Sequence, residues 1–138
     1  MDAEMQRLLA KLNANPGAPA AVITESETSL GLALPAEYIE FLKYSNGGSG
    51  FIGSVEYVIF WKTEELAPLN IAYEVQKYTP GLLIFGSNGG GEAYGFDTRS
   101  AACPIVRIPF IVMDWNDARP MGDSFFAFLR RLSEVIDE

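Results

Sequence analysis

Apolar residues recur every three or four positions in several stretches of this chain, and this spacing is typical of amphipathic helices. The fullest stripe lies near the end of the sequence and comprises Phe125, Phe128, Leu129, Leu132 and Ile136. The pattern predicts helices over residues 3–13, 24–32, 35–45 and 63–78, and from residue 123 or 124 to residue 136.

Local signals define the ends of these helices. Thr24 and Glu27 match a capping box, in which each side chain accepts a bond from the backbone of the other residue. Pro35 suits a first helical turn, where its missing N–H has no partner to lose. The glycines after residue 46 supply a left-handed exit for the third helix. Pro68 interrupts or restarts the helix over 63–78.

Strand-forming residues dominate the segments between the helices. We predict strands over residues 54–61, 82–85, 93–97 and 104–108, and a shorter one over 110–115. Residues 47–53 are expected to form a flexible turn and residues 116–122 a loop. Helices that flank a run of antiparallel strands indicate the α+β class.

The stretch LLIFGSNGGGEAYGFD at residues 82–97 is the strongest hairpin signal, because two strand-like runs flank an Asn-Gly pair. Its glycines do not match a phosphate-binding loop. Such a loop leads from a strand into a helix, whereas here a strand follows. Glu92 also adds negative charge where a phosphate would sit. We therefore expect a tight or bulged turn with a structural role.

The length and composition indicate an ordinary globular protein. The chain has 138 residues, 49% of them hydrophobic and 20% charged, so we expect one domain over residues 1–138. No apolar run approaches the roughly 18 residues of a membrane span. The first residues are acidic where a secretory signal needs basic ones, so the cytoplasm is the expected location.

The sequence contains no histidine, which excludes Ser-His and Cys-His nucleophiles and removes the commonest metal ligand. Its one cysteine, Cys103, precedes an apolar run and is expected to be a small buried residue. We expect no catalytic residue, no metal and no cofactor. An enzyme built on this chain would have to use carboxylates, lysine or tyrosine for proton transfer.

The net charge of −8 repels nucleic acid and anionic lipid but attracts a basic protein. The same charge also serves plain solubility. Three acidic residues, Asp114, Asp117 and Asp123, gather around Trp115, with Arg119 as the sole opposing charge. Neither a calcium-loop pattern nor a demonstrable carboxylate pair is present there. The alternatives are a solvated loop and a protein interface, and tryptophan is enriched in interfaces. The candidate partner-binding residues are Glu92, Asp114, Trp115 and Asp117.

Two blocks of the sequence resemble the SUKH superfamily, which includes the Smi/Knr-type cell-wall-assembly regulator domain. The first block, LGLALPAEYIEFLKYSNG at residues 30–47, matches its opening motif at Leu34, Pro35, Tyr38, Phe41, Asn46 and Gly47. The second block, residues 82–97, is similar to its glycine-rich turn and return strand at Gly86, Gly90, Gly91, Tyr94 and Asp97. With a closing Phe-rich helix, the resemblance covers residues 22–133.

The resemblance implies a single α+β domain in which helices surround a mixed, mostly antiparallel sheet. Many bacterial members look like immunity proteins that bind and neutralise toxins, often nucleases, and eukaryotic relatives are regulatory interaction proteins. The expected function is therefore non-enzymatic binding of a protein, for example a basic toxin domain. The matching motif residues are mainly architectural, so they do not transfer a binding site. The alternatives are a regulatory or scaffold module with a small-molecule cleft near the glycine turn, and a carboxylate hydrolase.

Overall fold

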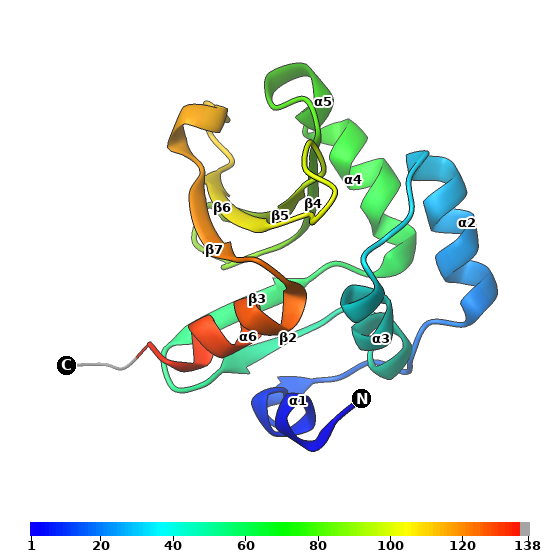
Figure 1. The fold of residues 1–138 in the computed structure, drawn as a ribbon, viewed down its shortest axis with the longest axis vertical. Coiled ribbons are helices and arrows are strands. Elements are labelled where there is room, and N and C mark those ends of the chain that lie inside the picture. Colours follow the sequence, from blue (N-terminus) through cyan, green and yellow to red (C-terminus); the bar gives the residue numbers. More distant parts are fainter. Residues whose placement is uncertain (136–138) are drawn as a thin grey trace.

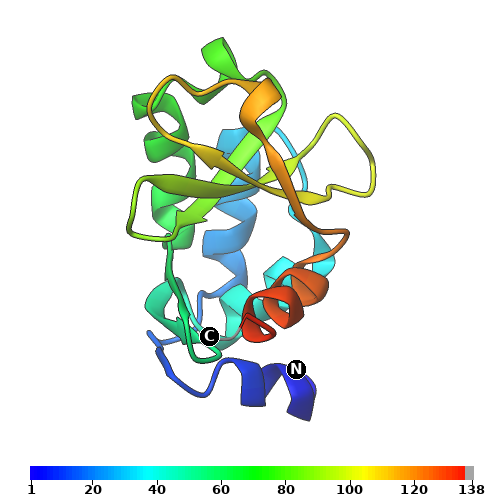
Figure 2. The ribbon, with the colours of Figure 1, turned by 90° about the vertical axis from the view of Figure 1, so that its left-hand side faces the viewer.

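The computed structural model describes residues 1–135 and is shown in Figures 1 and 2. Its helices are α1 (Ala3–Leu8), α2 (Ala20–Leu30), α3 (Ala36–Tyr44), α4 (Leu66–Ala72), α5 (Val75–Tyr78) and α6 (Phe125–Ser133), with 3-10 turns η1 (Thr63–Glu65) and η2 (Trp115–Asp117). Its strands are β1 (Leu12–Asn13), β2 (Gly48–Ile52), β3 (Glu56–Phe60), β4 (Leu82–Ser87), β5 (Glu92–Asp97), β6 (Ile105–Pro109) and β7 (Arg119–Gly122).

The strands form one sheet in which each strand pairs with the next one along the chain. Every strand pair among residues 1–135 is antiparallel. Figures 1 and 2 show that the sheet curves strongly around α6, while α2, α4 and α5 lie outside the curve. The predicted α+β class is confirmed, with an antiparallel meander as its sheet.

Aromatic rings fill the space between the sheet and the helices α3 and α6. Tyr38 of α3 lies 5.5 Å from Phe85 and 5.2 Å from Phe96, measured between ring centroids. From α6, Phe128 meets Tyr94 at 4.9 Å. These side chains are essentially inaccessible to solvent, so their burial supplies a large share of the hydrophobic stabilisation.

The predicted hairpin over 82–97 is confirmed as β4 and β5. Gly86 lies where β4 meets β3, and a Cβ atom there would be 2.5 Å from the carbonyl oxygen of Ile59. At the tip, the Asn88 side-chain oxygen accepts from the N–H groups of Gly90 at 2.8 Å and Glu92 at 3.1 Å. The glycine-rich turn therefore closes on itself through Asn88, in agreement with the structural role expected of it.

The predicted positions of strands were wrong on both sides of this hairpin. The expected flexible turn over 47–53 is mostly strand β2, and the expected loop over 116–122 contains strand β7. Residues 110–115, expected to form a strand, instead make a turn that leads into η2. Gly50 explains the first error, because a Cβ there would lie 2.6 Å from the carbonyl oxygen of Lys11 on the neighbouring segment. Glycine serves close strand approach here and not flexibility.

Several helix ends also differ from the prediction. The first helix ends at Leu8, and Leu12 belongs to β1. Helix α2 begins at Ala20, one turn before the predicted capping box, and the Glu27 carboxylate accepts instead from the N–H of Leu34 at 2.7 Å. The helix over 63–78 is broken into η1, α4 and α5, with Glu74 in a left-handed conformation (φ 53°) between the last two.

The C-terminal helix follows the prediction more closely. Ser124 caps α6, since its hydroxyl accepts from the N–H of Ala127 at 3.1 Å. Its apolar stripe is buried up to Leu132, and Ile136 lies outside the described residues. Cys103 is only half-buried, contrary to expectation, because it closes a turn with a positive φ of 49°. None of the helices in residues 1–135 has the length and apolarity that a membrane crossing requires.

Candidate functional site

The first motif block holds the body of the molecule together. Leu34, Tyr38 and Phe41 are buried in the core. The Tyr38 hydroxyl has no hydrogen-bond partner within residues 1–135, and burial raises its pKa far above the ordinary tyrosine value. A hydroxyl sealed in this way stays protonated and has no access to a substrate. Pro35 precedes α3 as its N-cap residue.

Asn46 joins the end of α3 to the η1 turn. Its side-chain oxygen accepts from both the N–H and the hydroxyl of Thr63 at 2.7 Å, and its amide donates to Glu64 at 2.7 Å. This last bond lowers the pKa of the Glu64 carboxyl. Gly47 follows with a φ of 76°, and a Cβ there would lie 2.8 Å from the Phe60 carbonyl oxygen. Both residues are therefore architectural.

In the second block, Asp97 links β5 to the loop before η2. Its carboxylate accepts from Arg99 Nε at 2.9 Å and from Arg99 Nη2 at 3.0 Å. These bonds lower the pKa of the Asp97 carboxyl. The guanidinium lies 3.6 Å above the Trp115 ring centre, a cation–π arrangement. The Trp115 indole N–H donates to the Pro80 carbonyl at 3.0 Å, so Trp115 fastens its loop to the body.

The segment 110–117, which we call the apical loop, lies along the facing segment 73–80. Three contacts join the two segments: the rings of Phe110 and Tyr73 are 4.7 Å apart, Thr79 Oγ1 lies 3.2 Å from Met113 Sδ, and Trp115 bonds to Pro80. The apical loop and α5 lie at the same end of the molecule in both ribbon views. The loop is therefore held at both of its ends.

Between these contacts the apical loop presents two large apolar side chains to solvent. Ile111 is 82% exposed and Val112 is 83% exposed. Val112 also has a φ of 54°, which a β-branched residue rarely adopts and which costs free energy. Tyr73 and Tyr78 on the facing segment are 45% and 53% exposed. The apical loop and the segment that it faces therefore both carry exposed apolar side chains.

Acidic side chains border this surface. Asp114 caps η2 by accepting from the N–H of Asn116 at 2.9 Å, and Asp117 lies in the same turn. Both are exposed, and neither makes an ion pair with any residue in the described part of the chain. Among the nearby basic side chains, Arg99 pairs with Asp97 and Lys77 with Glu74. Arg119, two residues after Asp117, is exposed and makes no ion pair in the described residues. An apolar centre with a polar rim is typical of a protein-binding surface.

Of the four residues predicted to bind a partner, Asp114, Trp115 and Asp117 come together in the apical loop. Glu92 lies beside the start of the apical loop, since it is the strand partner of Pro109, but its carboxylate pairs with Arg107 at 3.4 Å and is not grouped with the other three. Ile111 and Val112 were missed by the sequence analysis. Residues 110–115 had been assigned to a strand, and the available signal was an apolar pair next to a run of acidic loop residues.

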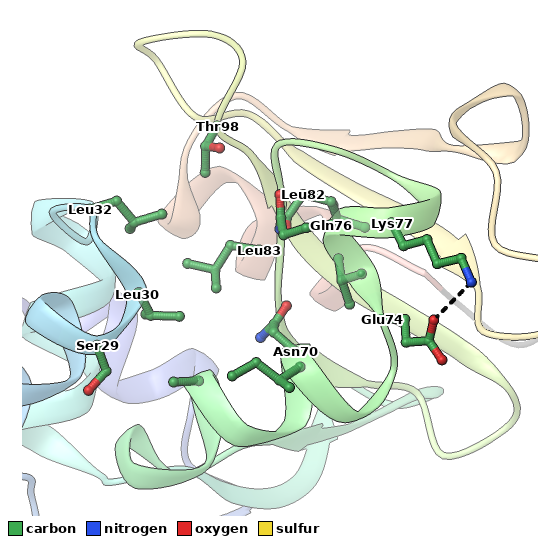
Figure 3. Close-up of a pocket in the computed structure, with 13 residues that line it drawn as sticks. Ser29, Leu30, Leu32, Asn70, Glu74, Gln76, Lys77, Leu82, Leu83 and Thr98 are labelled. Carbon is green, nitrogen blue, oxygen red and sulfur yellow. Dashed lines mark hydrogen bonds and ion pairs between the residues drawn. The ribbon is translucent and has the colours of Figure 1, made fainter.

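A cavity lies elsewhere, between the end of α2, the helices α4 and α5, and the start of β4 (Figure 3). Its volume is about 470 Å³. The glycine turn lines no part of it, so this cavity is not the small-molecule cleft that the alternative hypothesis placed near that turn. Among residues 1–135, no three acidic, histidine or cysteine side chains are grouped to hold a metal ion.

A family of known proteins matches this chain. No similar sequence was found among the curated proteins. The family whose model matches is the SMI1 / KNR4 family (SUKH-1), over residues 17–131, and this match includes both motif blocks, α2 to β7 and most of α6. The chain therefore belongs to the SMI1 / KNR4 family of the SUKH group.

Proposed function

We propose that this protein is a non-enzymatic binding domain that acts as an immunity protein, neutralising a basic bacterial toxin domain by binding it through the apical loop surface. That surface consists of the apical loop, residues 110–117, together with Tyr73 and Tyr78. The observation that carries the proposal is the exposure of Ile111 and Val112, at 82% and 83%, inside an acidic rim. A fixed apolar tip of this kind is a potential binding hot spot.

The charge of the molecule supports a basic partner. The net charge is −8, and Asp114 and Asp117 place two carboxylates beside the apolar tip, with Arg119 as the one exposed basic side chain next to them in the sequence. Complementary charge would speed encounter with a basic domain and disfavour acidic competitors. A nuclease domain fits this description, because such a domain must itself attract phosphate. Family membership is consistent with this kind of interaction.

The proposal predicts that a toxin-like domain is encoded beside the gene for this chain, and the test uses that domain. Co-expression should restore growth of cells that produce that domain, and the purified proteins should form a stable complex. The association rate should fall about tenfold or more between 0.05 and 0.5 M salt, because the Debye length shortens to about 4 Å. The double variant Asp114→Asn, Asp117→Asn should reduce this salt dependence. Asparagine at residue 114 retains the capping oxygen, so η2 should persist.

Absence of a complex at micromolar concentrations of both proteins would contradict the proposal. So would growth rescue by catalytic destruction of the toxin, seen as cleaved or modified toxin without a stable complex.

A further inference from the structure

The cavity beside β4 exists because β3 and β4 pair over only part of their length. The two strands pair through Ile59 with Ser87 and Phe60 with Gly86, so the first half of β4 has no strand on that side. Helices α4 and α5 cover this free edge, and α2 packs outside them. A space of about 470 Å³ remains between these elements. This volume lies within the range of about 300–1,000 Å³ for ligand pockets.

The walls of this cavity are mainly aliphatic. Figure 3 shows Leu30, the last residue of α2, and Leu32, just after the helix, facing Leu83 of β4 across the open space. Further apolar lining comes from Ala67, Ile71, Val75 and Leu82. Ile71 lies at the mouth with 76% of its surface exposed.

Asn70 and Gln76, the polar side chains of the cavity that lie beside β4, are already occupied, and Ser29 of α2 is exposed to solvent. The Asn70 amide donates to the carbonyls of Leu66 at 2.7 Å and Ile84 at 2.9 Å, and its oxygen accepts from the Ile84 N–H at 2.9 Å. The Gln76 amide donates to the Leu82 carbonyl at 2.8 Å, and its oxygen accepts from Gly81 at 2.9 Å. These two side chains replace the missing strand along the edge of β4.

The two charged side chains that line the cavity have opposite charges and neutralise each other. Glu74 and Lys77 form an ion pair at 3.4 Å beside the opening, as Figure 3 shows. The Thr98 hydroxyl donates to the Gly81 carbonyl at 2.5 Å. A nucleotide, a sugar or a metal ion would therefore gain few bonds here, and burying its polar groups would cost free energy.

We propose that this cavity binds a small, uncharged, mainly aliphatic organic molecule. The aliphatic walls supply the attraction, since each methylene group transferred from water into them contributes favourably. A free molecule fits better than a bound peptide strand. A peptide that extends a sheet needs unpaired backbone groups at a strand edge, and Asn70 and Gln76 have taken those of Leu82 and Ile84. This site is separate from the apical loop surface and does not rest on the toxin-binding proposal.

The test measures binding of the uncharged fluorescent dye N-phenyl-1-naphthylamine, followed by its displacement with 1-hexanol, 1-octanol and 1-decanol. The dye should bind saturably with one site per chain. Each added methylene group should tighten displacement about fourfold while the chain still fits the cavity. Absence of saturable binding, or equal displacement by all three alcohols, would overturn the proposal.

Two variants locate the bound dye. Ala67→Phe fills the cavity from α4 and should weaken dye binding tenfold or more, whereas Ala72→Phe on the same helix, outside the cavity lining, should not. Ile71→Glu places a charge at the exposed mouth and should weaken binding by a similar factor with the fold intact, so it decides the question if Ala67→Phe does not fold. Unchanged dye binding in a folded Ala67→Phe or in Ile71→Glu would overturn the proposal.

Discussion

At the scale of single residues, the polar side chains of the two motif blocks bind neighbouring backbone and position other side chains. Asn46 holds Thr63 at the start of η1. Asp97 holds Arg99, and Arg99 covers one face of Trp115. The aspartate of the second block thus acts at a distance on the apical loop, because the loop is fastened through Trp115.

The pH dependence of stability should show this role of Asp97. Bonds from Arg99 lower the pKa of Asp97 in the folded protein. The carboxylate therefore contributes stability above its unfolded pKa of about 3.9, and this contribution is lost as the pH falls through the lower folded pKa. Asp97→Asn should unfold at a lower urea concentration than the parent at pH 7. The two midpoints should converge near pH 2.

Asp123→Asn is the matched control for this measurement, since Asp123 is exposed and makes no ion pair in residues 1–135. Its midpoint should equal that of the parent at pH 7. A constant difference between Asp97→Asn and the parent across the whole pH range would show that the charge on Asp97 has no part in stability.

At the scale of secondary-structure elements, the α3–β2 junction depends on Gly47. Its φ is 76°, and a Cβ would lie 2.8 Å from the Phe60 carbonyl oxygen and 3.0 Å from the Lys62 nitrogen. Gly31, at the end of α2, has a similar φ of 72° but open space around it. A side chain at Gly31 would meet only backbone strain, whereas a side chain at Gly47 would meet the same strain and a steric clash.

Replacing each of these glycines by alanine should therefore give unequal losses. We expect Gly31→Ala to lower the free energy of unfolding by about 1–2 kcal/mol, the cost of a left-handed residue. Gly47→Ala should cost about 3 kcal/mol or more, because the added methyl group also displaces backbone. Urea unfolding of both variants measures the difference. Equal decreases in the free energy of unfolding would contradict this expectation, because they would mean that the backbone near Phe60 moves to accommodate the methyl group at no cost.

The sequence predicted those elements whose signals are local. The hairpin over 82–97 has its turn residues between two apolar runs, and α6 has a capping serine before a regular stripe. Strands β2 and β7 were missed because Gly48, Gly50 and Pro120 have weak intrinsic strand preference. Their pairing with distant segments determines their structure, and a single sequence does not display it.

The candidate site was predictable only in part for the same reason. Asp114, Trp115 and Asp117 are close in sequence, so their grouping needed no knowledge of the fold. The contribution of Tyr73 and Tyr78 depends on a contact between segments that are about 35 residues apart, such as that between Trp115 and Pro80. The cavity depends on incomplete pairing of β3 with β4, which leaves no local pattern.

At the scale of the whole molecule, the curved sheet separates a packed interior from two outward features. The aromatic core with α3 and α6 lies inside the curve, and the apical loop lies at one end of the molecule beside α5 (Figures 1 and 2). The cavity lies on the α2 side of α4 and α5. A partner on the apical loop would therefore leave the core untouched, so binding and stability should respond to different substitutions.

The most direct test of this account is the dissociation constant of the complex between the toxin domain and Ile111→Asp. Val55→Asp serves as control, because Val55 is also exposed, at 38%, but lies in the distant β2–β3 hairpin. We expect Ile111→Asp to keep the parental stability within about 0.5 kcal/mol. It should weaken binding about 30-fold or more, as a hot-spot residue does, while Val55→Asp binds like the parent. Parental affinity in Ile111→Asp, or a comparable loss in Val55→Asp, would contradict the assignment of the apical loop as the binding surface.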